Sequence, residues 1–311
     1  MKEKKYNISK EDIINLYQKG LCAKEVSQSL GVSYGTLLVR QREYGIHSYD
    51  YLDIRSSYNV HVFDEIDTEE KSYWAGFIFA DGHVRSSKTD NSVSVQLNDI
   101  DHGHLIKLKN FFEDKRPDSV IWVREGITEV SKKTQVMCTY QVCSRYIKTA
   151  LINIGCPPRK SNILKFPNLS IFKEEHLVYD FIRGYIDGDG CLSAYHTKKG
   201  DRLNISIRGT LDFLTGISNI FPQIHIYKET DKRTGHILYH SACGGDKADE
   251  VAYKLYENAN VYLDRKYEKY ATLCRLHNSE TSDKIGESCD ANAEVTPEIA
   301  KGSESTVENS E

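Results

Sequence analysis

The amino-acid sequence predicts an α+β protein in which two matched halves, each built around an antiparallel sheet, follow a small all-α unit. Three observations support this prediction. A segment ending in Asp-Gly occurs twice, as WAGFIFADG and IRGYIDGDG, and its last aspartates are Asp81 and Asp189. Segments of alternating apolar and polar residues follow each copy. Residues 8–46 instead show the apolar spacing and end signals of short helices.

Residues 8–46 predict three helices. Ser9 and Asp12 form a capping-box pattern at the start of the first. A second helix is expected over Ala23–Leu30, Gly31 marks a turn, and Ser33 is expected to cap a third helix. This order resembles the helix-turn-helix of DNA-binding domains, and we assign it to residues 1–48. The candidate DNA contacts on the third helix are Tyr34, Thr36, Arg40 and Arg42. A plain three-helix bundle with solvated arginines remains the alternative.

The segments flanking the two halves lack sustained periodicity. Residues 49–66 are predicted to be a linker, and residues 279–311 an acidic disordered tail. That tail holds nine acids and two bases, a net charge of −7, so the formal −4 of the whole chain leaves +3 for residues 1–278. A mildly basic folded part permits nucleic-acid binding but does not establish it.

The two halves are assigned to residues 67–170 and 171–278. Apolar residues alternate with polar ones around Val93–Leu97 and Leu203–Ile207, as expected for half-buried strands. QVMCTYQVC and HILYHSAC are further strand candidates, while HLIKLKNFFE and TLDFLTGISNIF show helical periodicity. Each half is therefore expected to run helix, strands, helix, strands, helix.

Small residues recur four apart in both motifs. Gly76 and Ala80 share one helix face, and Gly184 and Gly188 share the corresponding face of the second motif. If these faces pack together about a pseudo-twofold axis, Asp81 and Asp189 converge. A carboxylate at a helix C-terminus is unfavourable by ~0.3–1 kcal/mol, and two of them repel each other. Such a pair is reasonable where divalent cations bind between the acids.

A lysine follows each motif at a matched distance along the chain. Lys160, in CPPRKS, follows Asp81 at nearly the same separation as Lys266, in YLDRKY, follows Asp189. A single Asp-Gly is explained as well by a simple helix cap and turn. Two motifs that each carry a lysine at the same distance favour a functional pair.

The paired motifs and lysine segments are similar to those of the LAGLIDADG homing endonucleases in their single-chain, two-repeat form, over roughly residues 68–277. The resemblance implies two pseudo-symmetric αββαββα repeats whose sheets form a saddle on DNA. It implies metal binding by Asp81 and Asp189 and catalytic roles for these acids, Lys160 and Lys266. It also implies DNA contacts from strand residues Gln96, Arg202, Asn204, Ser206 and Arg208. Phe79 departs from the motif, where the family name has Asp, and Trp74 replaces its first Leu.

The function expected from this resemblance is a site-specific, Mg²⁺-dependent double-strand cut in DNA by phosphodiester hydrolysis. The expected partner is double-stranded DNA, and we expect a cytoplasmic monomer. Intron RNA would be a further partner if the chain also acted as a maturase. The other alternative is a DNA-binding regulator of the same fold without catalysis, although such relatives usually lose the acids that are retained here.

The remaining chemistry-bearing residues are given no function. The eight cysteines include no C-x-x-C pair, which fits reduced thiols, and Cys138, Cys143 and Cys191 receive no role. His102 and His104, near Asp99 and Asp101, are interpreted as a polar loop between strand and helix rather than as a metal site. No apolar run approaches the length that a helix needs to cross a membrane, and no signal peptide is evident, so neither a membrane span nor secretion is expected.

Overall fold

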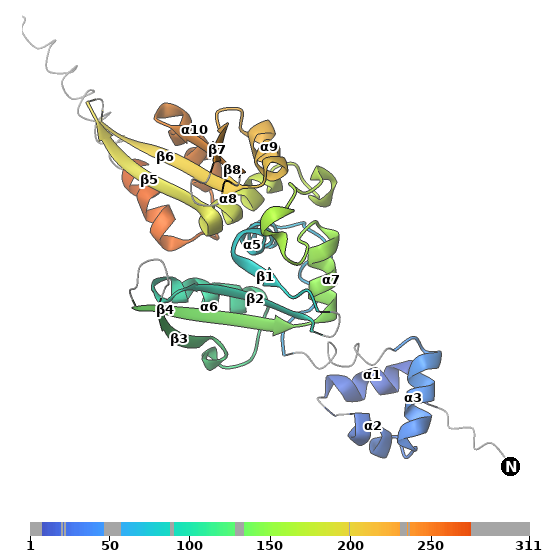
Figure 1. Cartoon of the computed structure of the whole chain (residues 1–311). Coiled ribbons are helices and arrows are strands. Elements are labelled where there is room, and N and C mark those ends of the chain that lie inside the picture. The colour runs from blue at the N-terminus through green and yellow to red at the C-terminus, as the bar shows by residue number, and fades with distance from the viewer. Residues whose placement is uncertain are drawn as a thin grey trace, which may run out of the picture.

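The computed structural model describes residues 8–19, 21, 23–46, 57–87, 90–127, 134–198, 200–230, 235 and 237–274. The predicted acidic tail and residues 49–56 of the predicted linker lie outside these residues. Within them, the prediction of an α+β fold with two matched repeats is confirmed (Figure 1). No helix among the described residues is both long and apolar enough to cross a membrane.

Three helices lie at the N-terminus, close to their predicted positions: α1 (Lys10–Gln18), α2 (Ala23–Ser29) and α3 (Tyr34–Glu43). Ser9 and Asp12 form the expected capping box, and Ser33 caps α3 by accepting from the backbone of Thr36. Gly31 turns the chain between α2 and α3 with φ of +64°, a conformation that costs glycine little. These helices pack around a small core of their own: Ile8, Ile13, Tyr17, Val26, Leu37 and Ile46.

The two repeats have the same order of elements. The first contains α5 (Glu69–Asp81), β1 (Gly82–Val84), β2 (Ser92–Asn98), η1 (Asp99–Asp101), α6 (His102–Phe111), η2 (Asp118–Val120), β3 (Trp122–Ile127), β4 (Thr134–Cys143) and α7 (Arg145–Asn153). After η3 (Lys160–Asn162) and η4 (Leu169–Ile171), the second contains α8 (Leu177–Asp189), β5 (Gly190–Thr197), β6 (Gly200–Gly209), α9 (Leu211–Ile220), β7 (His225–Thr230), β8 (Ile237–Gly244) and α10 (Asp246–Tyr256). A last helix spans residues 264–274.

Each repeat folds into a four-stranded antiparallel sheet. The strand orders, β1-β2-β4-β3 and β5-β6-β8-β7, correspond one to one. The alternation seen in the sequence places Val93, Val95 and Leu97 of β2 in the core, and Leu203, Ile205 and Ile207 of β6 likewise. Because side chains alternate along a strand, the residues between them form the opposite, solvent-facing surface of each sheet.

The motif helices α5 and α8 lie side by side between the two sheets (Figure 1). Both are buried over most of their length, which explains the apolar run Tyr73–Ala80 in α5. In α8 the buried segment also contains charged residues, of which Arg183 pairs with Asp180 and Asp187 accepts from Tyr256. The chain enters β1 directly from α5, and β5 directly from α8. The helix ends that carry the motif aspartates are therefore continuous with the first strand of each sheet.

The described part of the predicted linker is not a linker. Val60, Val62, Phe63 and Ile66 are buried in the main core, and Phe63 packs against the rings of Phe111 and Phe112. Residues 57–66 therefore belong to the first repeat. Their irregular spacing gave no periodic signal because they form neither a regular helix nor a strand.

The segment between α7 and α8 also departs from the predicted boundary. Residues 154–170 fall within the predicted first repeat, but Thr210 of the second repeat donates to the carbonyl of Leu164. Phe166 packs against Phe181 of α8 and Phe213 of α9. This segment therefore joins the two repeats as part of a shared core.

Candidate active site

Glycines allow α5 and α8 to meet backbone to backbone. A Cβ on Gly76 would lie 2.0 Å from the carbonyl oxygen of Phe181, and a Cβ on Gly184 would lie 2.0 Å from that of Tyr73. No side chain fits at either point. The sequence prediction that small residues four apart permit close packing of the motif helices is confirmed.

The same packing brings the two motif acids together. At Gly188 an added Cβ would lie 2.4 Å from Cβ of Ala80 and 3.3 Å from a carboxylate oxygen of Asp81. Asp81 thus lies against the residue that precedes Asp189, at the C-terminal end of both helices. Asp81 is half-buried and Asp189 is exposed. Among the described residues, neither carboxylate has a hydrogen-bond donor or an ion-pair partner.

The electrostatics of this pair favour a cation between the acids. Burial, followed by the charge of Asp189, raises the pKa of Asp81 to about 6. Burial also raises the pKa of Asp189, while Lys160 and Lys266 act in the opposite direction. Since Asp189 reaches solvent, water screens it, and we place the larger shift on Asp81. Two oxygen-only ligands without donors of their own fit a hard divalent cation such as Mg²⁺.

Lys160 lies at the end of α5. Its Nζ donates to the carbonyl oxygen of Ala80, one residue before Asp81. Arg159, immediately before it, has φ of +57°, in the left-handed region that non-glycine residues rarely adopt. This tight turn directs Lys160 toward the helix end. There its positive charge partly offsets the rise that burial causes in the pKa of both acids.

Lys266 occupies the corresponding place at the end of α8 but is fully buried. Its Nζ donates to the carbonyl oxygens of Ile186, Asp187 and Gly190 at 2.6–2.7 Å. Burial lowers the pKa of this lysine to about 8. The structure therefore brings both lysines and both acids to one site, with the lysine side chains capping the two helix ends that carry the acids.

The two motifs differ at the position where the first has Phe79 and the second Asp187. Asp187 is buried and accepts hydrogen bonds from the hydroxyls of Tyr73 and Tyr256 and from the backbone of Leu263. Phe79 packs against the ring of Phe181 instead. This position therefore serves packing in the first repeat and a buried hydrogen-bond network in the second.

A cleft of about 940 Å³ opens beside Asp189. Lys160, Tyr185 and Arg208 line it together with the acid, and Leu211, Ile237 and Leu238 form an apolar wall. The cleft places the predicted strand residue Arg208, which is exposed, near Asp189.

The other predicted DNA contacts on β6 differ from Arg208 in their exposure and in their partners. Asn204 and Ser206 are half-buried on the solvent-facing side of the second sheet. Arg202 is engaged within the protein, because its guanidinium pairs with Asp246 at 2.9 Å and Asp249 at 3.7 Å. Arg202 lies just outside the part of β6 that pairs with β8, which ends at Asn204 and Gly244. At this end of the sheet the chain leaves β8 and turns into α10. An internal ion pair of this kind reduces the availability of Arg202 for a phosphate or base.

Gln96 is the predicted contact on the first sheet, where it is exposed and donates to the hydroxyl of Thr139. The strand pairing reveals polar or aromatic neighbours on the same faces that sequence reasoning missed. They are His83, Ser94, Trp122, Arg124 and Gln141 on the first sheet, and Ser193, Tyr195, Tyr227 and His240 on the second. Alternation within β3 and β7 could have indicated some of them, but cross-strand register could not be inferred from the sequence.

The candidate residues of the N-terminal unit all lie on α3. Tyr34 and Arg42 are exposed. Arg40 pairs with Glu43 at 2.6 Å, and the hydroxyl of Thr36 lies 2.9 Å from that of Ser33, within the helix cap. Tyr34 and Arg42 thus remain the more accessible members of the set.

Residues 99–104 do not form the predicted polar loop. Asp99–Asp101 is a 3-10 turn that leads into α6. Within this segment, Asp101 accepts from Nε of Arg265 at 3.0 and 3.1 Å, and the buried His104 lies 3.0 Å from the hydroxyl of Tyr73. The segment contacts the second repeat beside Lys266.

Comparisons with known proteins concern the fold. No protein-family model and no curated protein matches this chain. Among solved structures, the homing endonuclease I-WcaI bound to its DNA recognition sequence is similar, at 11% identity and a TM-score of 0.47, over 65% of this chain and 87% of that one. The LAGLIDADG homing endonuclease I-GzeII in complex with its DNA target shows 12% identity and a TM-score of 0.42, over 70% and 95%. I-SmaMI, bound to uncleaved DNA in the presence of calcium ions, shows 13% identity and a TM-score of 0.40, over 68% and 92%.

Proposed function

We propose that this protein is a site-specific DNA endonuclease that hydrolyses one phosphodiester in each strand of a duplex. The observation that carries the proposal is the convergence of Asp81 and Asp189, which the glycine contacts between α5 and α8 hold at one point. Neither acid has a donor among the described residues, and burial together with the charge of Asp189 raises the pKa of Asp81 to about 6. Two acids held together without donors lower the stability of the folded protein. Cation binding between them explains why such an arrangement is present.

In this proposal Asp81 and Asp189 hold the divalent ions, with Mg²⁺ the expected metal. When bound, such ions neutralise charge on a phosphate and lower the pKa of water, which supplies the nucleophile. The pseudo-twofold relation of the repeats matches the approximate symmetry of the two strands of a duplex. Each repeat therefore contributes one acid and one sheet, and the two repeats together serve the two strands of the duplex.

Lys160 and Lys266 supply positive charge at the same site. In the free protein, their amino groups are held on main-chain carbonyls at the ends of α5 and α8. From there each is close enough to shift the pKa of the acids. In our proposal they stabilise the negative charge that develops on the phosphate oxygens, or orient the attacking water.

The solvent-facing surfaces of the two sheets form the proposed DNA-binding surface. Strands can enter the major groove, where base edges present distinct patterns of donors and acceptors. Gln96, Asn204, Ser206 and Arg208 have the polar groups for this role. The N-terminal helices, through Tyr34 and Arg42, would add contacts outside that surface and lengthen the recognised site.

The direct test is incubation of the full chain with a randomised duplex library and Mg²⁺, followed by sequencing of the cut ends. We expect one preferred sequence that is cut in both strands. Asp81→Asn and Asp189→Asn should not cut, whereas Asp64→Asn, an exposed acid outside the site, should cut normally. If the wild-type protein binds one DNA sequence selectively but does not cut it, the alternative of a non-catalytic DNA-binding regulator is favoured. Cutting that persists in both motif variants would refute the site.

A further inference from the structure

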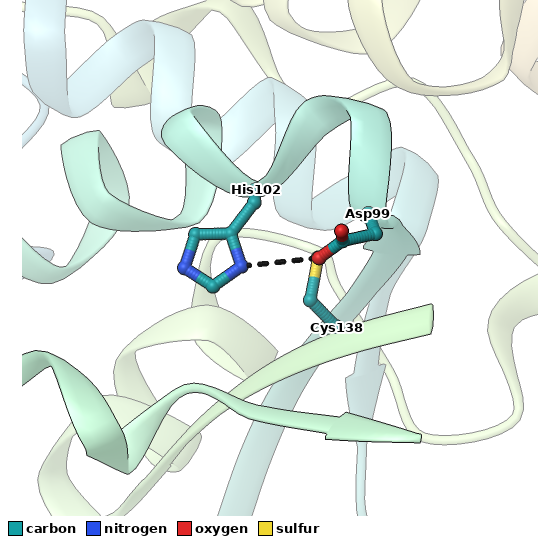
Figure 2. A group of neighbouring side chains, drawn as sticks. All are labelled: Asp99, His102 and Cys138. Carbon is teal, nitrogen blue, oxygen red and sulfur yellow. Dashed lines mark hydrogen bonds and ion pairs between the residues drawn. The ribbon is translucent and has the colours of Figure 1, made fainter. Parts of the chain in front are cut away.

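Asp99, His102 and Cys138 come together in the first repeat, from three separate elements. Asp99 begins the 3-10 turn η1, His102 is the first residue of α6, and Cys138 lies in the middle of β4. One ligand atom of each residue lies within 4.8 Å of the others. Figure 2 shows the three side chains pointing toward one another.

We propose that Asp99, His102 and Cys138 form a binding site for a Zn²⁺-like cation, distinct from the site of Asp81 and Asp189. A sulfur, an imidazole nitrogen and a carboxylate oxygen are the three donor types that zinc takes in proteins. Magnesium prefers oxygen ligands and has little affinity for sulfur, so the donor set separates the two sites by metal type.

The distances suit a tetrahedral ion. Zinc bonds of about 2.3 Å to sulfur and about 2.0–2.1 Å to nitrogen and oxygen place neighbouring ligand atoms about 3.3–3.6 Å apart. Nδ1 of His102 and Oδ1 of Asp99 are already 3.3 Å apart. The widest separation in the set, up to 4.8 Å, must close by about 1 Å. Asp99 is exposed and His102 half-buried, so both can make this adjustment around the buried Cys138.

The free-state contacts of Cys138 are weak enough to be exchanged. Its sulfur lies 3.5 Å from the carbonyl oxygen of Leu97 and 3.7 Å from that of Asn98. Binding would replace the S–H bond with an S–metal bond and release the proton to solvent. Three protein ligands leave a fourth position, which the exposure of Asp99 makes accessible to water.

The location points to a structural role. The turn that carries Asp99 also carries Asp101, which accepts from Arg265 beside Lys266. In α6, two residues after His102, His104 contacts Tyr73 of α5. An ion that ties this turn to β4 would stabilise the segment through which the first repeat contacts the second. The proposed zinc site does not depend on the proposed DNA cleavage.

The test uses cobalt as a spectroscopic probe of the full chain. Co²⁺ added to the reduced, metal-free protein should produce the near-ultraviolet absorption of a thiolate–cobalt bond and the visible bands of tetrahedral cobalt. Zn²⁺ should abolish both, and a large excess of Mg²⁺ should not. Cys138→Ser should abolish the thiolate absorption, whereas Cys143→Ser, which changes an exposed cysteine of the same strand, should leave it unchanged.

Asp99→Asn and His102→Ala provide a second test that does not disturb the core, since neither side chain is buried. Each should weaken Co²⁺ binding by about tenfold or more. His61→Ala is the matched control, because His61 and Asp64 form another i, i+3 pair, at 2.7 Å, that has no place in the cluster. The proposal is wrong if the folded wild-type protein shows no thiolate absorption, if that absorption survives in Cys138→Ser, or if Asp99→Asn and His102→Ala bind cobalt like the wild type.

Discussion

Gly184 of α8 lies so close to Tyr73 of α5 that a Cβ would come within 2.0 Å of the tyrosine carbonyl oxygen. The obstacle is backbone, which cannot rotate aside as a side chain can. This contact and its counterpart at Gly76 determine the separation of the motif helices, and hence whether Asp81 and Asp189 meet.

Gly184→Ala should therefore force the helices apart. We expect the free energy of unfolding to fall by about 3 kcal/mol or more, since overpacking against backbone cannot relax locally. DNA cleavage should be lost even below the melting temperature. Gly103→Ala is the control, because a Cβ on this α6 residue meets nothing within 4 Å. Helix propensity alone should stabilise that variant by ~0.5–1 kcal/mol. Equal stability of Gly184→Ala and wild type in thermal and chemical unfolding would contradict the packing argument.

Asp81→Asn and Asp189→Asn should each reduce double-strand cleavage below detection and leave the affinity for DNA within a fewfold of wild type. The acids lie at the ends of α5 and α8 and not on the strand faces that form the proposed DNA-binding surface. Electrophoretic mobility shift in calcium, beside a cleavage assay in magnesium, separates the two effects. Loss of binding parallel to loss of cleavage would show that the acids shape the DNA surface instead.

The raised pKa of Asp81 predicts a pH dependence of stability in the metal-free protein. An acid with a raised folded-state pKa holds its proton more tightly when folded, so the free energy of unfolding decreases as pH rises from about 4 to about 6. Above pH 6 the ionised Asp81 costs at most about 3 kcal/mol. Asp81→Asn should be more stable than wild type at pH 7, and the two should converge near pH 4. Urea unfolding in the presence of a chelator measures this difference, and parallel profiles would contradict it.

The two lysines should differ in stability and in strand preference. Lys266→Met removes the donor from two buried carbonyls and one partly buried carbonyl and should cost about 2–5 kcal/mol, whereas Lys160→Met loses one such bond and should cost about 1 kcal/mol. Below their melting temperatures, each variant should slow one strand by ~10²–10³ and accumulate nicked duplex, with opposite strands affected. Strand-specific end labelling detects this, and Lys165→Met, an exposed lysine on the same segment as Lys160, is the control. Equal slowing of both strands by each variant would indicate that the lysines act only on structure.

A fragment that begins at Ser57 should fold without the N-terminal helices, but one that begins at Asp67 should not. The second fragment lacks Val60, Phe63 and Ile66, whose burial contributes about 1.5–3 kcal/mol each. The longer fragment should keep metal-dependent cleavage with weaker DNA binding. Circular dichroism and thermal unfolding compare the two fragments. Cooperative unfolding of the shorter one at the same temperature would show that residues 57–66 add little.

The sequence by itself determined the features that depend on one segment at a time. Ser9, Ser33 and Gly31 predicted the N-terminal helix ends, alternation around Val95 and Ile205 predicted the central strands, and small residues in both motifs predicted close helix packing. Such signals are local because capping, strand alternation and helix faces involve residues only a few positions apart. Recurrence of the motif then related the two halves, including both acids and both lysines.

Only the tertiary structure decided what depends on distant segments. Arg202 belongs to a polar strand face by alternation, yet the turn into α10 places Asp246 beside it. Residues 57–66 lack any periodic apolar pattern, but their apolar side chains are buried against residues from distant parts of the chain. The meeting of Cys138 with Asp99 and His102 depends on the register of β4 against β2, which pairs Cys138 with Leu97. Register and long-range packing follow from the collective fit of the whole core, and no single segment carries that information.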